Sequence, residues 1–524
     1  ATWLAIGASI FASNIGSEHL IGLAGAGASS GMAMAHWEIQ GWMILILGWV
    51  FVPFYSRSMV YTMPEFLERR YNPQSRTILS VISLVSYVLT KVAVTVYAGG
   101  LVFQQVFGIK ELWGIDFFWI AAIGLVVLTA LYTIFGGMKS VLYTSVLQTP
   151  ILLLGSLIIL VLGFKELGGW DEMMRVCGAV TVNDYGDTMT NLIRSNDDAN
   201  FPWLGALIGS AIIGFWYWCT DQFIVQRVLS GKNEKEARRG TIFGAYLKLL
   251  PVFLFLIPGM IAFALHQKYI GAGGEGFLPM LANGTANADA AFPTLVAKLL
   301  PAGVKGLVVC GILAALMSSL ASLFNSSAML FTIDFYKRFR PETPEKKLVG
   351  IGQIATVVIV ILGILWIPIM RSVGDVLYTY LQDVQSVLAP GIAAAFLLGI
   401  CWKRTSAQGG MWGLIAGMII GLTRLGAKVY YSNAGEVADS TFKYLFYDMN
   451  WLFFCGWMFL FCIIVVIVVS LATEAPTAEK IQGLVFGTAT KEQKAATRAS
   501  WDHWDIIHTV IILAITGAFY WYFW

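Results

Sequence analysis

An apolar segment near the start of the chain is interrupted by residues that hydrocarbon tolerates only at a cost. The run FASNIGSEH, residues 11–19, places two hydroxyls, an amide, a glycine, a carboxyl and an imidazole inside that segment. Backbone N–H and C=O groups need partners in hydrocarbon, and an isolated carboxylate at mid-depth is unfavourable there. A helix broken at that depth offers free carbonyls to a cation and polar side chains to a solute. The run therefore predicts one wall of a solute site.

A second interruption strengthens this interpretation. The run GFWYWCTDQ, residues 214–222, places aromatic residues, a Thr, an Asp and a Gln in another apolar segment, five spans further along the chain. Each interruption alone could equally be a kink that is packed without a ligand. Two interruptions at matching positions are typical of transporters built from inverted repeats. The pair favours a transport site over two unrelated kinks.

A pair of hydroxyls in a later apolar segment suits a cation. Ala315, Ser318 and Ser319 fall on one helical face by their i, i+3, i+4 spacing. Two hydroxyls and a carbonyl suit a hard monovalent cation, and the carbonyls of Ala12 and Ile15 in the interrupted segment could complete the set. Taken alone, such a serine pair is more often a helix-packing feature.

Three further polar residues suit a polyhydroxylated solute. Glu38 opens the second apolar segment, Lys248 lies in the seventh, and Gln382 lies in the tenth beside Asp383 and Gln385. A carboxylate accepts from hydroxyls, an ammonium donates to them, and a carboxamide does both. The alternative is that Glu38 lies at the outer interface and Lys248 snorkels to a structural carbonyl. The aromatic residues that could close such a pocket are Trp37, Tyr217, Trp218 and Tyr378.

The composition indicates which elements must position these residues. Of 524 residues, 57% are hydrophobic and 12% charged, and the mean hydropathy of +0.72 excludes a soluble domain. We predict an all-α, multi-pass membrane protein. Its thirteen apolar runs are residues 3–29, 37–56, 78–107, 116–136, 141–165, 202–229, 240–265, 302–333, 349–370, 376–402, 408–427, 450–472 and 503–524.

The distribution of Lys and Arg predicts the orientation. If the chain starts in the cytoplasm and alternates, most of its 34 cationic residues fall in the inside segments. The start of the chain is then cytoplasmic and its end extracellular, in a cell membrane. The net charge of +3 follows from this topology and indicates the lipid bilayer rather than nucleic acid as a partner. Because the first span begins almost at Ala1, we expect a segment to precede it.

Several motifs resemble those of the sodium/sugar cotransporters of the solute:sodium symporter family. They are FASNIGSEHLIGLAG, VYTMPEFLERRY, ALYTIFGGMKSVLYT, WYWCTDQFIVQR, ALMSSLASLFNS and PGIAAAFLLGICWKR, and they run nearly from end to end. The resemblance implies a core of five plus five helices in an inverted repeat. Residues 1–165 would form the first repeat, 166–201 an extracellular loop, 202–402 the second repeat, and 403–524 the appended helices with a cytoplasmic linker at 473–502.

The resemblance also implies roles for individual residues. Sodium ligands fall on Ala12, Ile15, Ala315, Ser318 and Ser319. Sugar contacts fall on His19, Glu38, Lys248, Gln382 and Tyr217, with Tyr217 as the inner gate. The gating positions are Leu23, Trp37, Tyr217, Trp218 and Tyr378. Neither ligand set includes Glu18, which we expect to hold the break open by bonding to backbone or to a neighbouring span.

Two positions depart from the family pattern. Ser145 stands where many members have an Asp linked to sodium coupling, so we expect one sodium per solute. Gly214 stands where members have Asn or Thr, so the selectivity for hydroxyls could differ.

The resemblance implies a function and leaves alternatives to it. The expected function is sodium-coupled symport of a hexose, glucose or galactose, by alternating access. A sodium-coupled symporter of another polyol such as myo-inositol is an alternative, since the same polar residues would serve it. A membrane sensor that binds solute without moving it is an alternative of another class. An enzyme is not expected, because no nucleophile, metal or cofactor motif accompanies the polar cluster.

Overall fold

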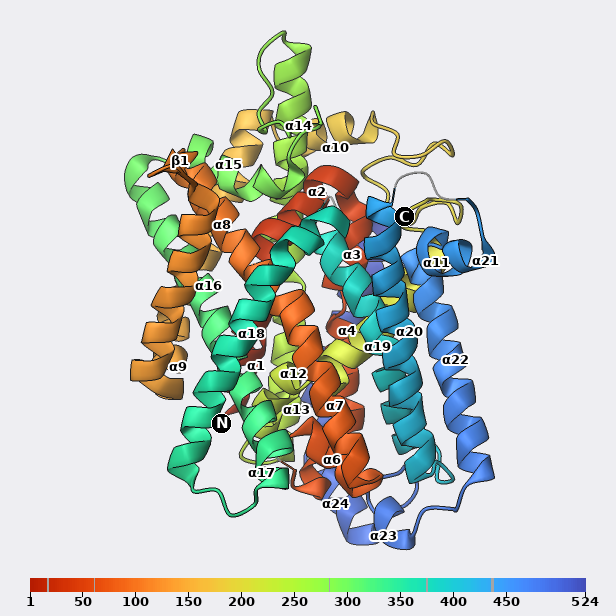
Figure 1. Ribbon diagram of the computed structural model, residues 1–524. Coiled ribbons are helices and arrows are strands. Elements are labelled where there is room, and N and C mark those ends of the chain that lie inside the picture. Colours follow the sequence, from red (N-terminus) through yellow and green to blue (C-terminus); the bar gives the residue numbers. More distant parts are fainter. Residues whose placement is uncertain (17, 61, 282, 374–375, 435–437) are drawn as a thin grey trace.

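The computed structural model describes residues 1–524 except residues 17, 61, 282, 374–375 and 435–437, and it leaves undescribed the side chains of 132, 134–149 and 371–373. The described chain is a bundle of helices with one short β-hairpin (Figure 1).

Most elements follow one another with short connections, apart from the longer loops between α10 and α11 and between α14 and η7. The first part contains α1 (Trp3–Asn14), η1 (Glu18–Leu23), α2 (Ala24–Ser30), η2 (Gly31–Met34), α3 (Ala35–Glu38), α4 (Gly41–Ile46), η3 (Leu47–Phe51), α5 (Val52–Ser58), α6 (Met63–Arg70), α7 (Pro73–Ser86), η4 (Tyr87–Val92), α8 (Ala93–Phe107), β1 (Glu111–Leu112), β2 (Ile115–Asp116), α9 (Phe117–Leu167) and α10 (Trp170–Gly178). The second part contains α11 (Trp203–Gly214), η5 (Phe215–Thr220), α12 (Gln222–Leu229), α13 (Glu234–Leu247), η6 (Val252–Leu256), α14 (Ile257–Gly271), η7 (Ala288–Ala290), α15 (Ala291–Leu299), α16 (Ala302–Met329), η8 (Leu330–Tyr336), α17 (Lys337–Phe339), α18 (Glu345–Val373) and α19 (Leu377–Cys401). The last part contains α20 (Ala407–Asn433), α21 (Thr441–Lys443), η9 (Tyr444–Asp448), α22 (Trp451–Ala472), α23 (Ala478–Ile481), α24 (Lys491–Ala499) and α25 (His503–Tyr522).

The predicted membrane spans are helical. Among the described residues, eleven helices are long and apolar enough to cross a membrane, and Trp3–Asn14 and Phe117–Leu131 are shorter apolar helices. Each predicted span falls on one of these helices. The inside segment predicted at 137–140 lies among residues 134–149, whose side chains are not described, so the boundary between the spans at 116–136 and 141–165 stays a prediction.

Both predicted interruptions are confirmed as breaks in the helices. Helix α1 ends at Asn14, and Ile15 has an extended backbone with φ −80° and ψ 95°. No described N–H donates to the carbonyl of Ala12 or Ile15, whereas the carbonyl of Gly16 accepts from the backbone N–H of His19 at 3.2 Å. In the second break, Asp221 is extended and caps α12 by accepting from the backbone N–H of Phe223 at 3.2 Å.

Short π-helical segments carry several of the polar residues near the breaks. Segment η1 carries Glu18 and His19, η4 carries Lys91, and η5 carries Tyr217 and Trp218. A π-turn widens the helix and re-aims the side chains that follow it, and such segments are frequent at functional sites. These segments therefore turn polar residues inward from helices that are otherwise apolar.

Glycines let both halves of the broken first span pack closely against the seventh span. Helix α1 lies on α13, where a Cβ on Gly240 would come within 2.6 Å of the Ile6 side chain. Helix α2 lies on α14, where a Cβ on Gly259 would come within 1.9 Å of the Ala24 carbonyl oxygen. At both contacts only glycine permits the observed approach of the two helices.

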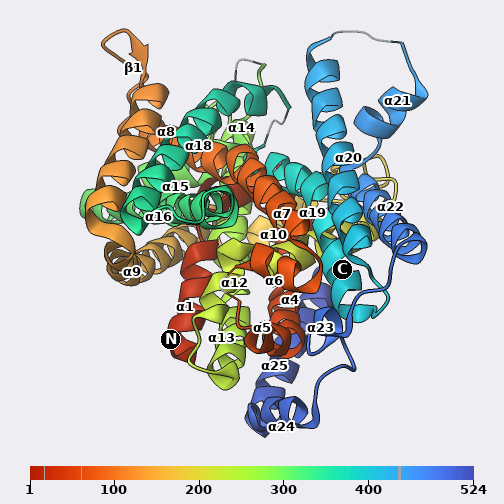
Figure 2. The same cartoon turned by 60° about the horizontal axis from the view of Figure 1, so that its bottom comes forward.

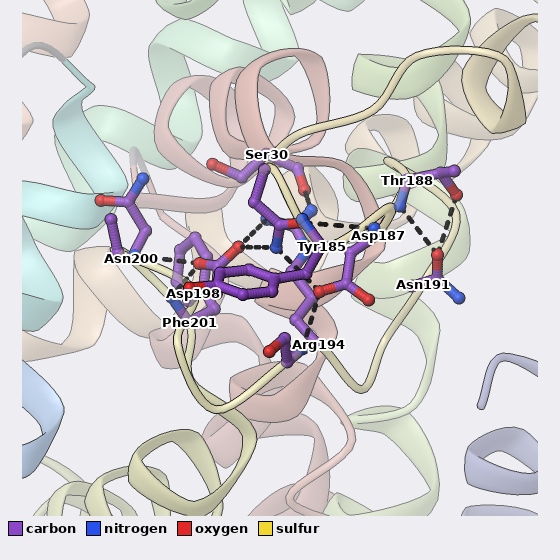
Figure 3. A network of polar contacts seen from close by, with 12 residues as sticks. Ser30, Tyr185, Asp187, Thr188, Asn191, Arg194, Asp198, Asn200 and Phe201 are labelled. Atoms are coloured by element: carbon purple, nitrogen blue, oxygen red, sulfur yellow. Dashed lines mark hydrogen bonds and ion pairs between the residues drawn. The ribbon is translucent and has the colours of Figure 1, made fainter.

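The two ends of the bundle differ. Segments α23 and α24 lie at the end nearer the N-terminus, and α10, the loop that follows it and the C-terminus lie at the opposite end (Figures 1 and 2). Hydrogen bonds order the loop between α10 and α11 (Figure 3). Asp198 accepts from the backbone N–H of Phe201 at 2.7 Å, and Arg194 donates to the carbonyl of Ser30 at the end of α2. The loop is thereby fastened to the first span, and Phe201 has a fixed position.

Candidate functional site

One buried carboxylate joins four elements at the centre of the bundle. Glu38, at the end of α3, is 0% exposed and accepts from Lys248 Nζ at 2.6 Å. Glu38 also accepts from the Tyr378 hydroxyl at 2.5 Å and lies 3.1 Å from His19 Nε2. The alternative that Glu38 lies at the outer interface is therefore wrong.

Lys248 occupies a turn between α13 and η6, three residues before Pro251. A proline at that place removes a backbone donor and ends the preceding helix. The ammonium makes a second bond to Asn14 Oδ1 at 3.2 Å and lies 5.4 Å from the centre of the Trp218 ring. Lys248 is 3% exposed and bonds side chains, so the alternative of snorkelling to a structural carbonyl is wrong.

These side chains border a small cavity of about 40 Å³. It is lined by Asn14, Glu18, His19, Trp37, Glu38, Gln40, Ile213, Gly214, Tyr217, Trp218, Lys248, Tyr378, Leu381, Gln382 and Gln385. The structure thus brings together all five residues predicted to contact the solute.

Sequence reasoning missed one polar residue of the cavity wall. Gln40 lies against Gly214, where an added Cβ would be 2.5 Å from Gln40 Oε1. Its amide donates to the Ser210 carbonyl at 2.7 Å. The Gln40 side chain therefore occupies the space beside Gly214. The departure at Gly214 was the available signal, but it could not tell which neighbour fills the space.

Three buried polar atoms of the cavity wall have no hydrogen-bond partner among the described residues. They are His19 Nδ1, Trp37 Nε1 and Gln382 Oε1. Burying a polar group without a partner costs about 1 to 3 kcal/mol, and such groups are rare in native interiors. Two ring nitrogens and an amide oxygen can bind hydroxyl groups as donors or acceptors.

Aromatic side chains cover the cavity. Trp37 stacks on Trp451 of α22, with ring centres 5.4 Å apart, and meets Phe201 of the ordered loop at 6.1 Å. The Tyr217 hydroxyl accepts from Asn14 Nδ2 at 3.2 Å, and its ring meets Trp218 edge-on at 5.0 Å. The remaining predicted gating residues, Leu23 and Tyr378, are buried at 0% and 3% exposure.

A second buried ion pair lies beside Tyr217. Lys91 Nζ is 3.4 Å from Asp221 Oδ2, and the two side chains are 5% and 3% exposed. The Tyr87 hydroxyl donates to Asp221 Oδ1 at 3.1 Å, and Lys91 Nζ lies 5.0 Å from the centre of the Tyr217 ring. The pair therefore connects the second break to the predicted inner gate.

Helix α16 meets the first break where sodium ligands are predicted. A Cβ on Gly16 would lie 2.8 Å from Ser319 Oγ and 2.8 Å from Glu18 Oε2. Ala315 and Ser318 lie within one turn before Ser319 on the same helix. The ligand set stays a prediction, and the side chain of Ser145 lies outside the described residues.

The bond expected of Glu18 is not seen among the described residues, where its carboxylate has no hydrogen-bond or ion-pair partner. At the break, the Gly16 carbonyl accepts from the backbone N–H groups of His19 and Leu20 at 3.2 and 3.3 Å.

A carboxyl outside the membrane-spanning helices fastens the helix that carries Tyr378. Both oxygens of Asp289 accept from the backbone N–H of Leu377 at 3.2 Å. Asp289 is 4% exposed, and burial raises its pKa to about 7.

Stability should depend on pH through Asp289. A raised folded-state pKa contributes stability that is complete below 3.8, the ordinary value, and is lost as the pH rises through about 7. Asp289→Asn cannot ionise, so it should remove this pH-dependent part of the free energy of unfolding, which amounts to about 4 kcal/mol at most. We expect the melting temperature of the unaltered protein, minus that of Asp289→Asn, to fall between pH 4 and 7 and then stay constant. A difference that is independent of pH would contradict this assignment.

The chain matches the Sodium:solute symporter family over residues 1–417. It belongs to that family. This symporter is 36% identical over 499 residues to human Sodium/myo-inositol cotransporter 2, a match that covers 93% of this chain and 73% of the relative. It is 37% identical over 508 residues to the dog Sodium/myo-inositol cotransporter, covering 93% and 70%. The solved structure of a Na+-coupled sialic acid symporter in a substrate-bound outward-open state is 22% identical, covers 91% of both chains and has a TM-score of 0.68, which shows a shared fold.

The expected fold class is thereby confirmed. This protein is a multi-pass, all-α membrane symporter with the five-plus-five inverted-repeat core, and sodium is its coupling ion.

Proposed function

We propose that this protein carries myo-inositol, or a closely similar cyclic polyol, into the cell together with sodium. The names of its relatives support inositol over the hexose expected from the motifs. The observation that carries the proposal is the set of three unsatisfied polar atoms that belong to residues lining one cavity. A ring that bears hydroxyls on every carbon can satisfy donors and acceptors arranged around it.

The paired charges would position the solute. Glu38 holds Lys248 and His19 in fixed orientations, so neither side chain loses much freedom when solute binds. Gln382 Oε1 and His19 Nδ1 offer an acceptor and a ring nitrogen, while Tyr217 closes the cavity beside Asn14. Release into the cell would require Tyr217 to swing aside and the Asn14 bond to break.

Sodium would act through the first break. Each sodium ion that enters supplies about 2.3 kcal/mol per 100 mV of membrane potential for moving the solute against its gradient. The sodium concentration gradient adds to this energy. Bound between α1 and α16, the ion would hold the two halves of the first span in the arrangement that completes the solute site. Alternating access follows if this arrangement opens to one side at a time.

A hexose remains the second candidate substrate, because its hydroxyls can make the same kinds of bond. The test is uptake of labelled myo-inositol into proteoliposomes with and without an inward sodium gradient, in competition with unlabelled glucose and galactose. The proposal predicts uptake that sodium drives and that unlabelled myo-inositol suppresses at lower concentration than either hexose. Stronger suppression by a hexose would identify the hexose as substrate. Saturable binding without counterflow would identify a sensor.

Ser319→Ala should weaken sodium dependence. The change removes an oxygen that faces the break and leaves the helix intact, so the sodium concentration for half-maximal uptake should rise about tenfold, the loss of one good ligand contact. Thr423→Ala is the control, because that hydroxyl bonds the Ile419 carbonyl of its own helix at 2.7 Å. Equal sodium titrations for Ser319→Ala and Thr423→Ala would remove Ser319 from the ligand set.

A further inference from the structure

The Glu18 carboxylate occupies an unusual place. It is the first residue of η1, directly after the break, and it lines the central cavity. Its side chain is half-buried, and no described residue donates a hydrogen bond to it. A partly buried carboxylate without a donor or counterion is unfavourable. A positively charged ligand or a hydrogen-bond donor, which the described side chains do not supply, would stabilise the carboxylate at this position.

The same carboxylate shares the break with Ser319. Both Glu18 Oε2 and Ser319 Oγ lie 2.8 Å from the point that a side-chain carbon on Gly16 would occupy. The carbonyl of Ile15, which no described N–H satisfies, immediately precedes this glycine. A carboxylate and a hydroxyl thus lie close together beside the broken backbone, and oxygen ligands of this kind suit a hard cation.

The neighbouring cations are already engaged. Lys248 is bonded to Glu38 at 2.6 Å, and Lys91 pairs with Asp221 at 3.4 Å. Glu18 interacts with both ammonium groups through the Coulomb field without contacting either. Its negative charge is the one charge of the described cavity wall that lacks a direct partner of opposite sign.

We propose that Glu18 supplies the negative charge of the sodium site and binds the transported ion together with Ser319. This inference rests on the proposed sodium-coupled function and deepens it. Because Glu18 also borders the solute cavity, the ion it holds would lie beside the solute, and η1 would carry both ligands on one short segment. Solute binding would then depend on the position that sodium gives to Glu18.

Binding of radioactive sodium to the purified full chain in lipid nanodiscs, without solute, tests the inference. Glu18→Gln keeps the size of the side chain and removes its charge, so half-saturation should need at least about tenfold more sodium. Glu18→Asp, which keeps the charge, should recover most of that loss. Glu38→Gln should keep sodium binding while it loses solute binding, and the exposed Glu111→Gln should change neither.

A second variant covers the case in which Glu18→Gln fails to fold. Gly16→Ala keeps Glu18 and places a methyl group between its carboxylate and the Ser319 hydroxyl, so sodium affinity should fall. The melting temperature of this variant shows whether it is folded. Equal sodium affinity in the unaltered protein, Glu18→Gln and Gly16→Ala would overturn the role of Glu18. Absence of sodium binding and of sodium-driven uptake in the unaltered protein would instead overturn the proposed function, so the two failures are distinguishable.

Discussion

Glu38→Gln is expected to reduce sodium-driven solute uptake by at least about a hundredfold, because breaking a buried ion pair costs about 3 to 5 kcal/mol. The amide would leave Lys248 without a counterion, and its NH2 group would replace one of the two oxygens that accept from Lys248 and Tyr378 at 2.6 and 2.5 Å. The measurement is initial uptake in proteoliposomes at saturating sodium, with the amount of reconstituted protein held equal.

The control for this prediction is Glu166→Gln, which changes an exposed carboxylate in the last turn of α9. Uptake by that variant should match the unaltered protein. Combining Glu38→Gln with Lys248→Met should cost less than the sum of the two single changes, because the partners act as a pair. Uptake within a few-fold of normal in Glu38→Gln would place the solute elsewhere.

Asp221→Asn is expected to destabilise the fold by about 3 to 5 kcal/mol, since it leaves a buried ammonium without its partner. Lys91 would then lie among Tyr87, Tyr217 and Phe223 with only their rings to stabilise its charge. The measurement is thermal unfolding of the purified protein in detergent. The double variant Asp221→Asn with Lys91→Met should recover most of the lost stability, because an apolar pair of similar volume needs no counterion.

An exposed pair provides the control for Asp221→Asn. Lys443 Nζ lies 2.8 Å from Asp439 Oδ1, and the Asp439 side chain is 94% exposed. Exposed pairs contribute about 0 to 1 kcal/mol, so Asp439→Asn should leave the melting temperature unchanged. A similar loss for Asp439→Asn and Asp221→Asn would contradict the assignment of a buried, paired charge to Asp221.

The spans and the two breaks could be predicted from the sequence because hydrocarbon makes every polar interruption costly. That rule needs no knowledge of neighbours. It located the break at Ile15 and the extended residue at Asp221.

Partners across the bundle could not be predicted from spacing. Glu38 and Lys248 are 210 residues apart, so their bond depends on how α3 and α13 pack. Gln40 gave no signal of its own, because its place in the cavity wall depends on the space that Gly214 leaves. The sequence predicts a structural role for Glu18 because neither implied ligand set includes it, and only the positions of its neighbours show that it lacks a partner among the described residues.

The close packing of both halves of the first span on the seventh span has a mechanical consequence. The break that follows Asn14 does not move freely, since α1 is held on α13 and α2 on α14 through glycine contacts. The seventh span has its own turn at Lys248, and the bond from Lys248 to Asn14 joins the two interruptions at 3.2 Å. The first and seventh spans should therefore bend together, so that a displacement at either interruption is transmitted to the other.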